Sequence, residues 1–220
     1  RAADRAAAGP RPDCIRIDQV GILEPGMETN RLEAFSDAVL AIAITIMVLE
    51  LRAPAGDGLS SLRELWPVFL SYILSFVYLA IYWNNHHHML AVVHRVNGAV
   101  LWANMHLLFW LSLVPFVTGW MGENSFAPAP TAAYGVVLLL AAIAYYILQG
   151  RILSLEGPNS VLAHAVGSDW KGKSSPVIYA LAIPSAFIHP AIAGGLYALV
   201  ALIWLIPDRR IERALLQTEQ

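Results

Sequence analysis

The fold is decided by the stretch from Arg31 to Leu49, which reads RLEAFSDAVLAIAITIMVL. Charged side chains, a hydroxyl and an aromatic ring stand at the start of a segment that is otherwise apolar enough for lipid. A carboxylate costs roughly 2.5–3.5 kcal/mol at the centre of a membrane helix and less near its end. Asp37 is therefore expected to have a partner inside a helix bundle. The alternative is that it only marks a helix start in the headgroup region.

The helical wheel of this segment separates an aliphatic stripe from a polar patch. At about 100° per residue, Ile42, Ile46 and Leu49 fall within an arc of about 60°. Thr45 borders the stripe, whereas Ser36 and Asp37 lie about 120° and 140° from Ile42. Taken alone, the periodicity of the stripe fits ordinary packing or lipid contact.

The composition is that of a polytopic, all-α membrane protein. Of the 220 residues, 57% are hydrophobic and 14% are charged, whereas about 25% are charged in average soluble proteins. Several apolar runs approach the ~20 residues that a membrane-spanning helix needs. The net charge of −2 gives no sign of nucleic-acid binding. The single Cys14 excludes an internal disulfide and a multi-cysteine metal site.

The apolar runs predict six spans. Four lie at residues 35–51, 64–83, 98–121 and 131–149, with a kink at Pro115. The last run, 176–206, is too long for one straight span, so we predict two short helices, 177–188 and 191–206, that turn at His189-Pro190. The six helices form a transmembrane domain at 27–207. Residues 1–26 are expected to be a disordered tail or an extension at the start, and residues 208–220 a cytoplasmic tail.

Loop charge supports this topology. With six spans and both termini in the cytoplasm, eight basic residues outside the stretch 1–26 face inward and two face outward, as the positive-inside rule requires. The inner residues are Arg31, Arg95, Arg151, Lys171, Lys173, Arg209, Arg210 and Arg213, and the outer ones are Arg52 and Arg63.

Seven histidines raise the question of a metal site. Successive helical residues point about 100° apart, so His86, His87 and His88 cannot bind one ion, and the sequence has no HExxH or Cys/His spacing. No metal, cofactor or catalytic residue is predicted; a haem would need His106 and His189 at similar depth, which these spans do not give. A histidine or arginine near the cytoplasmic ends of the second and third spans is instead the predicted partner of Asp37.

The first helix carries a recognisable signature. Arg31-x-x-x-Phe35-Ser36-Asp37, followed by Ala41-Ile42-Ala43-Ile44-Thr45 and Val48-Leu49-Glu50-Leu51, resembles the first-helix signature of the transmembrane protein 175 family. Asn104 and Leu113-Val114-Pro115-Phe116 give looser support. These proteins are potassium-permeable channels of animal endosomes and lysosomes, with bacterial relatives that carry one six-helix repeat and assemble as tetramers. The resemblance covers residues 30–207.

The resemblance implies specific roles for the first helix. It would line the pore of a homotetramer, with Ile42, Ile46 and Leu49 as a hydrophobic constriction, and Thr45 matches a pore-helix threonine linked to potassium preference. It also implies a structural polar network at the cytoplasmic side, for which the candidate residues are Arg31, Phe35, Ser36, Asp37, His86, His87 and Asn104.

The function expected from the sequence is therefore passive potassium conduction rather than enzymatic catalysis. The chain would assemble with itself in the cell membrane of a bacterium and pass K⁺ and other monovalent cations, with no nucleic-acid partner. The alternative is a secondary transporter or metal exporter that uses Asp37 and the histidine cluster as its coupling site.

Overall fold

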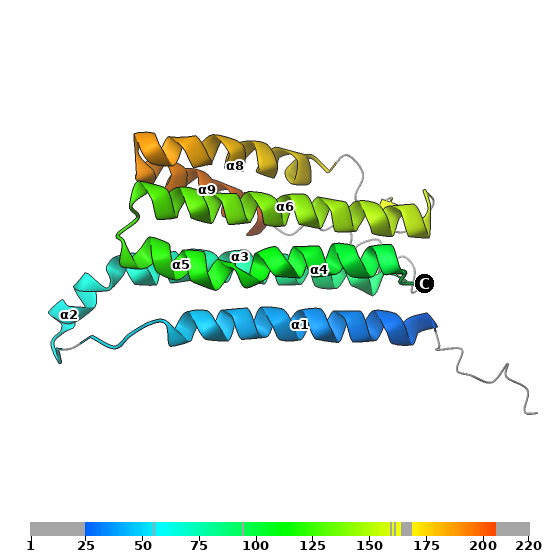
Figure 1. Cartoon of the computed structure of the whole chain (residues 1–220), viewed down its shortest axis with the longest axis horizontal. Helices are drawn as coiled ribbons and strands as arrows, with labels where there is room; N and C mark the ends of the chain where they lie inside the picture. Colours follow the sequence, from blue (N-terminus) through cyan, green and yellow to red (C-terminus); the bar gives the residue numbers. More distant parts are fainter. Residues whose placement is uncertain are drawn as a thin grey trace, which may run out of the picture.

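The fold is a bundle of long helices that run side by side along one axis (Figure 1). The computed structural model describes residues 25–205 except 55, 94, 159, 161 and 164–168, and within that part it holds helices and no strand. The helices are α1 (Pro25–Leu49), α2 (Leu59–Glu64), α3 (Trp66–Ala91), α4 (Gly98–Ser112), α5 (Val114–Glu123), α6 (Pro128–Glu156), α8 (Trp170–Ile188) and α9 (Pro190–Leu205).

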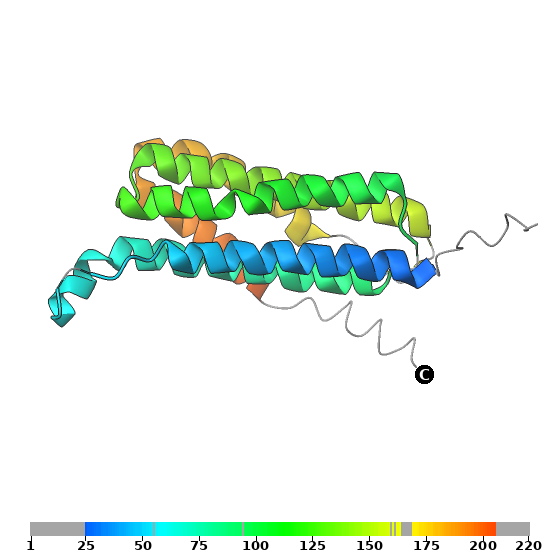
Figure 2. The same cartoon turned by 60° about the horizontal axis from the view of Figure 1, so that its bottom comes forward.

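The position of α1 in the bundle matters for function. α1 packs against α3, α4 and α5 along one edge, while α8 and α9 cover α6 on the opposite side (Figures 1 and 2). The short α2 projects beyond one end of the bundle (Figure 1). One side of α1 is therefore buried, and the other packs against none of the described helices.

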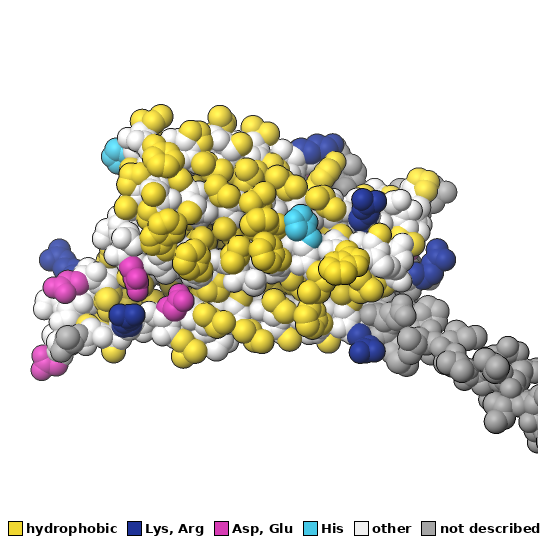
Figure 3. Space-filling model, in the orientation of Figure 1, with side chains coloured by type: hydrophobic (Ala, Val, Ile, Leu, Met, Phe, Trp, Pro, Cys, Tyr) yellow, Lys and Arg dark blue, Asp and Glu magenta, His cyan; other side chains and the backbone are white. Residues whose placement is uncertain are grey.

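The surface is that of a membrane protein. Hydrophobic side chains cover the middle of the face seen in Figure 3, and charged side chains lie at its two ends. Four stretches of the described residues are long and apolar enough to cross a membrane: Thr29–Leu49, Trp66–Ala91, Gly98–Glu123 and Pro128–Glu156. α9 is apolar but has only 16 residues. The protein is thus all-helical and multi-pass.

Two predicted helix breaks are confirmed, and both lie at prolines. α8 ends at Ile188, His189 is extended with φ −158° and ψ 115°, and Pro190 begins α9. A residue before proline is disfavoured in the α region, which explains this break. The third span divides at Leu113, and Pro115 lies in the first turn of α5, where a missing N–H costs little.

Several predicted boundaries are wrong. α3 continues to Ala91 rather than ending at residue 83, because the polar residues after Trp83 find partners on α1 and α4 and so need not leave the helix. α6 runs seven residues further than 149, and α8 begins at Trp170, capped by Asp169, rather than at 177. Of the expected tail 1–26, only the last two residues are described, as part of α1; the tail 208–220 lies outside the described residues.

Hydroxyl-bearing side chains tie the inner helices together. The Tyr78 hydroxyl donates to the backbone oxygen of Tyr197 at 2.6 Å, and the Tyr197 hydroxyl donates to the backbone oxygen of Thr131 at 3.0 Å. Ser75 is hydrogen bonded to Thr118 at 2.6 Å and to Tyr134 at 3.1 Å. These contacts fix α3 against α5, α6 and α9, and leave α1 as the outermost helix of its side.

Gly135 is predicted to be essential for the packing of α6 on α9. A methyl group at this position would overlap the Tyr197 hydroxyl and press on Ile183. Gly135→Ala is therefore expected to destabilise the protein by about 1–3 kcal/mol through overpacking, even though alanine favours helix. Gly150→Ala on the same helix meets nothing within 4 Å and serves as the control. Thermal unfolding in detergent measures both variants, and equal midpoints for the two would contradict this account.

Candidate pore face and polar network

The two sides of α1 differ completely in burial. Leu40, Ala43 and Met47 are at most 4% exposed and face the bundle, whereas Ile42, Ile46 and Leu49 are 58%, 43% and 75% exposed. The exposed residues follow a helical repeat and form one aliphatic stripe, which we call the α1 stripe. Large apolar side chains on the free side of an edge helix face either lipid or another protein surface.

Thr45 lies on the same exposed side. Its hydroxyl donates to the backbone oxygen of Ala41 at 2.8 Å. The donor is thus satisfied within the helix, and the oxygen lone pairs remain available to a cation or a water.

A hydrogen-bonded chain of buried polar groups occupies the opposite side of α1. The Asn104 amide nitrogen donates to the Ser36 hydroxyl at 2.9 Å, and the Ser36 hydroxyl donates to the backbone oxygen of Leu32 at 2.8 Å. The Asn104 carbonyl oxygen lies 2.7 Å from His86 Nε2. Because an amide oxygen only accepts, Nε2 must carry the proton in this arrangement. Ser36, His86 and Asn104 are each at most 1% exposed, and the chain joins α1, α3 and α4.

The partner of Asp37 differs from the prediction. Trp83 Nε1 donates to Asp37 Oδ1 at 3.0 Å, in place of the expected histidine or arginine. His87 Nδ1 instead lies 2.7 Å from Glu33 Oε1 and stacks on Trp83 with ring centroids 5.8 Å apart. Glu33 and Asp37 are four residues apart on α1, and Trp83 and His87 are four apart on antiparallel α3, so the two pairs form consecutive rungs. Neither Glu33 nor Trp83 was among the predicted site residues.

Arg31 and Phe35 do not belong to the network side of α1. Both are exposed, and at 100° per residue both lie about 20° from Ile42. They extend the α1 stripe toward the start of the helix. The predicted polar residues therefore divide between two faces: Ser36, Asp37, His86, His87 and Asn104 come together, and Arg31 and Phe35 do not join them.

The other end of α1 carries an acidic hollow. Glu50 follows the last residue of the stripe and, with Arg52, Gly119 and Glu123, lines a hollow of about 380 Å³. Burial, and secondly the negative charge of Glu123, raise the pKa of the Glu50 carboxyl above its usual value. The Glu50 carboxylate lies close to Gly119, where a side chain would displace it.

The histidines point to separate partners rather than to one ion. His86 faces Asn104, His87 faces Glu33, and His106 Nε2 accepts from Trp110 Nε1 at 2.9 Å. Within the part of the chain that the structure describes, no group of three or more His, Cys, Asp or Glu side chains is arranged to hold a metal ion.

Comparison with known proteins identifies relatives over most of the chain. A sequence model of the family described as endosomal/lysosomal potassium channel TMEM175 matches residues 31–115. A potassium channel of Chryseobacterium sp. is 56% identical over 189 residues, covering 86% of this chain and 98% of the relative. A potassium channel of Chamaesiphon minutus is 32% identical over 195 residues, covering 81% of this chain and 94% of the relative.

A solved structure has the same fold. The crystal structure of a lysosomal potassium-selective channel TMEM175 homolog from Chamaesiphon minutus superposes with a TM-score of 0.73 at 31% identity. The match covers 82% of this chain and 98% of that chain.

Proposed function

We infer the function from the premise that this chain belongs to the TMEM175 family of potassium channels, as its relatives and the matching crystal structure establish. We propose that it is a potassium-permeable channel in which four copies surround one pore. Two relatives bear the name potassium channel, and one solved relative is described as potassium-selective. The observation that carries the proposal for this chain is the α1 stripe.

The pore is proposed to run along α1. The stripe, with Phe35 before it, is apolar, and none of the described helices of the subunit covers it. Copies arranged around an axis beside α1 would bring Ile42, Ile46 and Leu49 together as rings. Rings of this kind gate by dewetting when narrow and conduct when wide.

A preference for potassium over other cations then has to come from the width of the pore and from partial dehydration of the ion. Backbone oxygens inside α1 are occupied by helical hydrogen bonds, so they cannot form a carbonyl filter. Thr45 is the one polar side chain bordering the stripe between Ile42 and Leu49. We propose that its oxygen contacts the hydrated ion next to the constriction.

The buried network is proposed to hold α1 in register. Hydrogen bonds join the first half of α1 to α3 and α4 at three residues, Glu33, Ser36 and Asp37. They do so on the side away from the stripe, so the ion path and the structural contacts do not share residues. A shift of α3 or α4 would therefore move the constriction.

Liposome flux tests the proposed function. Purified protein in vesicles is expected to pass potassium passively, at a rate set by voltage and independent of a proton gradient. Transport that requires a proton gradient and shows fixed stoichiometry would overturn the channel in favour of a coupled transporter that uses Asp37.

The proposed topology places both termini in the cytoplasm with six spans, α8 and α9 being the last two. On the face in Figure 3, acidic and basic side chains lie at the α2 end and only basic ones lie at the other end. The positive-inside rule counts basic residues, and their eight-to-two distribution outside residues 1–26 supports an outward-facing α2. In a Cys14→Ser background, Asn124→Cys is expected to react with an impermeant thiol reagent in intact cells, and Thr218→Cys to react only after lysis. Labelling of position 218 from outside would mean five spans.

A further inference from the structure

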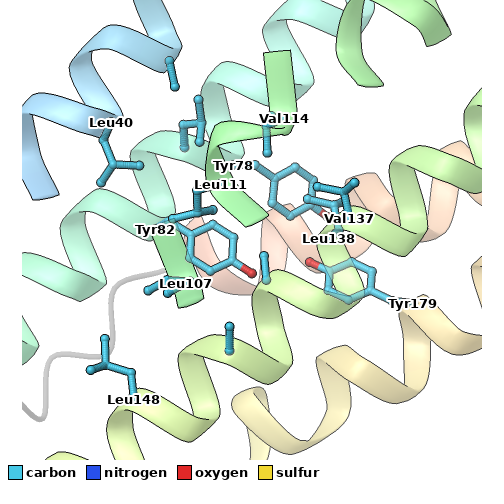
Figure 4. Packing of buried hydrophobic residues seen from close by; sticks show 14 of the residues in the cluster. Leu40, Tyr78, Tyr82, Leu107, Leu111, Val114, Val137, Leu138, Leu148 and Tyr179 are labelled. Carbon is cyan, nitrogen blue, oxygen red and sulfur yellow. The ribbon is translucent and has the colours of Figure 1, made fainter. Parts of the chain in front are cut away.

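The short helix α2 has an exposed face that is mostly apolar. We call it the α2 face, and its residues follow the helical spacing i, i+3, i+4 and i+7: Leu59, Leu62, Arg63 and Trp66. Leu59 is 86% exposed and Trp66 is 62% exposed, and no residue of α2 is buried. In the bundle, by contrast, leucine and tyrosine side chains pack between the helices (Figure 4). A helix of six residues is marginal by itself and is stabilised by packing of its apolar face, so the α2 face is expected to meet another surface.

The position of α2 favours a second copy of the chain as its partner. In both views α2 lies beyond the end of the bundle, on the same side as α1 (Figures 1 and 2). Copies in the proposed assembly meet beside α1, so α2 lies where a neighbouring subunit begins. This inference therefore rests on the proposed assembly of four chains.

The acidic hollow at the end of α1 is complementary to the α2 face in shape and polarity. Its apolar part consists of Phe116 and Trp120, whose rings are stacked with centroids 6.1 Å apart. Its polar part holds the carboxylates of Glu50 and Glu123 and one guanidinium, that of Arg52. None of the residues that line the hollow belongs to α2, so α2 does not fill it within its own subunit.

The charges of the two surfaces are also complementary. Two carboxylates and one guanidinium leave the hollow with an excess of negative charge when both acids are ionised. Burial, and secondly the charge of Glu123, raise the pKa of the Glu50 carboxyl, and a further cation would oppose this effect. The Arg63 side chain forms no hydrogen bond or ion pair with a described residue. It is therefore free to supply that cation, and a guanidinium makes strong, charge-assisted hydrogen bonds to carboxylates.

We propose that the α2 face of one subunit docks into the acidic hollow of the next copy around the pore. Arg63 pairs there with Glu50 and Glu123, and the apolar side chains of the α2 face pack on Phe116 and Trp120. The two surfaces are different parts of one chain, so the contact is head-to-tail, and contacts of this kind close into a ring when the rotation between copies allows it. It would join neighbouring subunits next to the end of the α1 stripe.

Disulfide cross-linking between two differently tagged chains tests this contact. Both chains carry Cys14→Ser; one also carries Arg63→Cys and the other Glu123→Cys, and the co-expressed, purified protein is treated with a mild oxidant. A band that contains both tags is expected, and it can form only between subunits. Glu64→Cys, which is also exposed on α2 but lies about 100° from Arg63 around the helix, replaces Arg63→Cys as the matched control. It is expected to cross-link at least several-fold less.

Reversal of charge tests the same contact without cysteine chemistry. Arg63→Glu would place a third carboxylate in the hollow and is expected to lower the fraction of assembled protein in dilute detergent solution several-fold. Adding Glu123→Arg to the same chain is expected to restore assembly. Glu64→Arg reverses a neighbouring charge on α2 and is expected to leave assembly unchanged. Equal effects of Arg63→Glu and Glu64→Arg, with no recovery in the double variant, would overturn the pairing.

The mass of the assembly, measured by light scattering on the cross-linking samples, separates this inference from the proposed function. A tetrameric mass with equal cross-linking from positions 63 and 64 would overturn the docking of α2 alone. A monomeric mass for the unaltered protein would overturn the assembly of four chains and this contact with it. In vesicles of brominated lipid, a fluorophore on Leu62→Cys is expected to be quenched less than one on Leu181→Cys, which is exposed on α8. Equal quenching would place the α2 face on the bilayer and overturn its docking on a second copy.

Discussion

Potassium flux through Ile42→Asn channels is expected to be about tenfold higher than through the unaltered protein, with weaker discrimination against sodium. Ile42 is 58% exposed at the centre of the α1 stripe. Asparagine side chains from all copies, placed around the constriction, would hold water and remove the dewetting barrier. A barrier lower by only about 1.4 kcal/mol gives a tenfold rate. Flux and bi-ionic potentials of reconstituted channels measure both effects.

Val48→Asn is the matched control for this prediction. Val48 is also a branched aliphatic residue on α1 and is 44% exposed, but it lies about 120° from Ile42 around the helix. It is expected to leave selectivity unchanged. Flux and selectivity that stay at the wild-type level in Ile42→Asn, Ile46→Asn and Leu49→Asn would show that the stripe does not line the pore.

Asn104→Leu is expected to be the most destabilising substitution in the polar network. It removes both the donor to Ser36 and the acceptor for His86 Nε2. Each buried group left unpaired costs roughly 1–3 kcal/mol. His86 Nδ1 already has no partner among the described residues, so the whole ring would be left without a hydrogen bond. We expect a fall of several degrees or more in the unfolding midpoint and a loss of assembled protein.

Asn84→Leu on α3 provides the comparison. Asn84 is half-buried and has no hydrogen-bond partner in the described part of the chain, so its replacement is expected to have little effect on the midpoint. Equal midpoints for Asn104→Leu and Asn84→Leu, measured in the same detergent, would contradict the role given to the Ser36–Asn104–His86 chain.

The helical periodicity of α1 was sufficient to predict which of its residues share a face, but not which face packs in the bundle. Ile42, Ile46 and Leu49 share an arc because 3.6 residues complete a turn, and the side of α1 that packs on α3 to α5 is the opposite one. The His189-Pro190 break was predictable for a similar reason, since backbone sterics at proline act locally. Both inferences need only residues that are near each other in the sequence.

The pairing of polar residues could not be predicted in the same way. Asp37 was expected to attract a cation, but the register of antiparallel α1 and α3 brings Trp83 opposite Asp37 and His87 opposite Glu33. That register depends on packing across the whole helix pair. The i, i+4 spacing of Glu33 with Asp37, and of Trp83 with His87, was the available signal. It becomes informative only when two antiparallel faces are matched.

The length of α3 shows a second limit to what can be predicted from local composition. The run from Trp83 to His88 is polar enough to suggest a loop, and the predicted span ended there. In the bundle, Asn85, His86 and His87 all have hydrogen-bond partners, so the helix extends to Ala91. Hydropathy does not record such partners, because those of His86 and His87 come from α4 and α1.

The measurement that tests the pore along α1 most directly is modification of single cysteines during potassium flux. In a Cys14→Ser background, a positively charged thiol reagent is expected to stop flux through Ile46→Cys channels, because position 46 lies on the stripe. Met47→Cys is expected to keep its flux, since Met47 is only 2% exposed and faces the bundle. Block of Met47→Cys with unhindered flux through fully labelled Ile46→Cys would contradict the account.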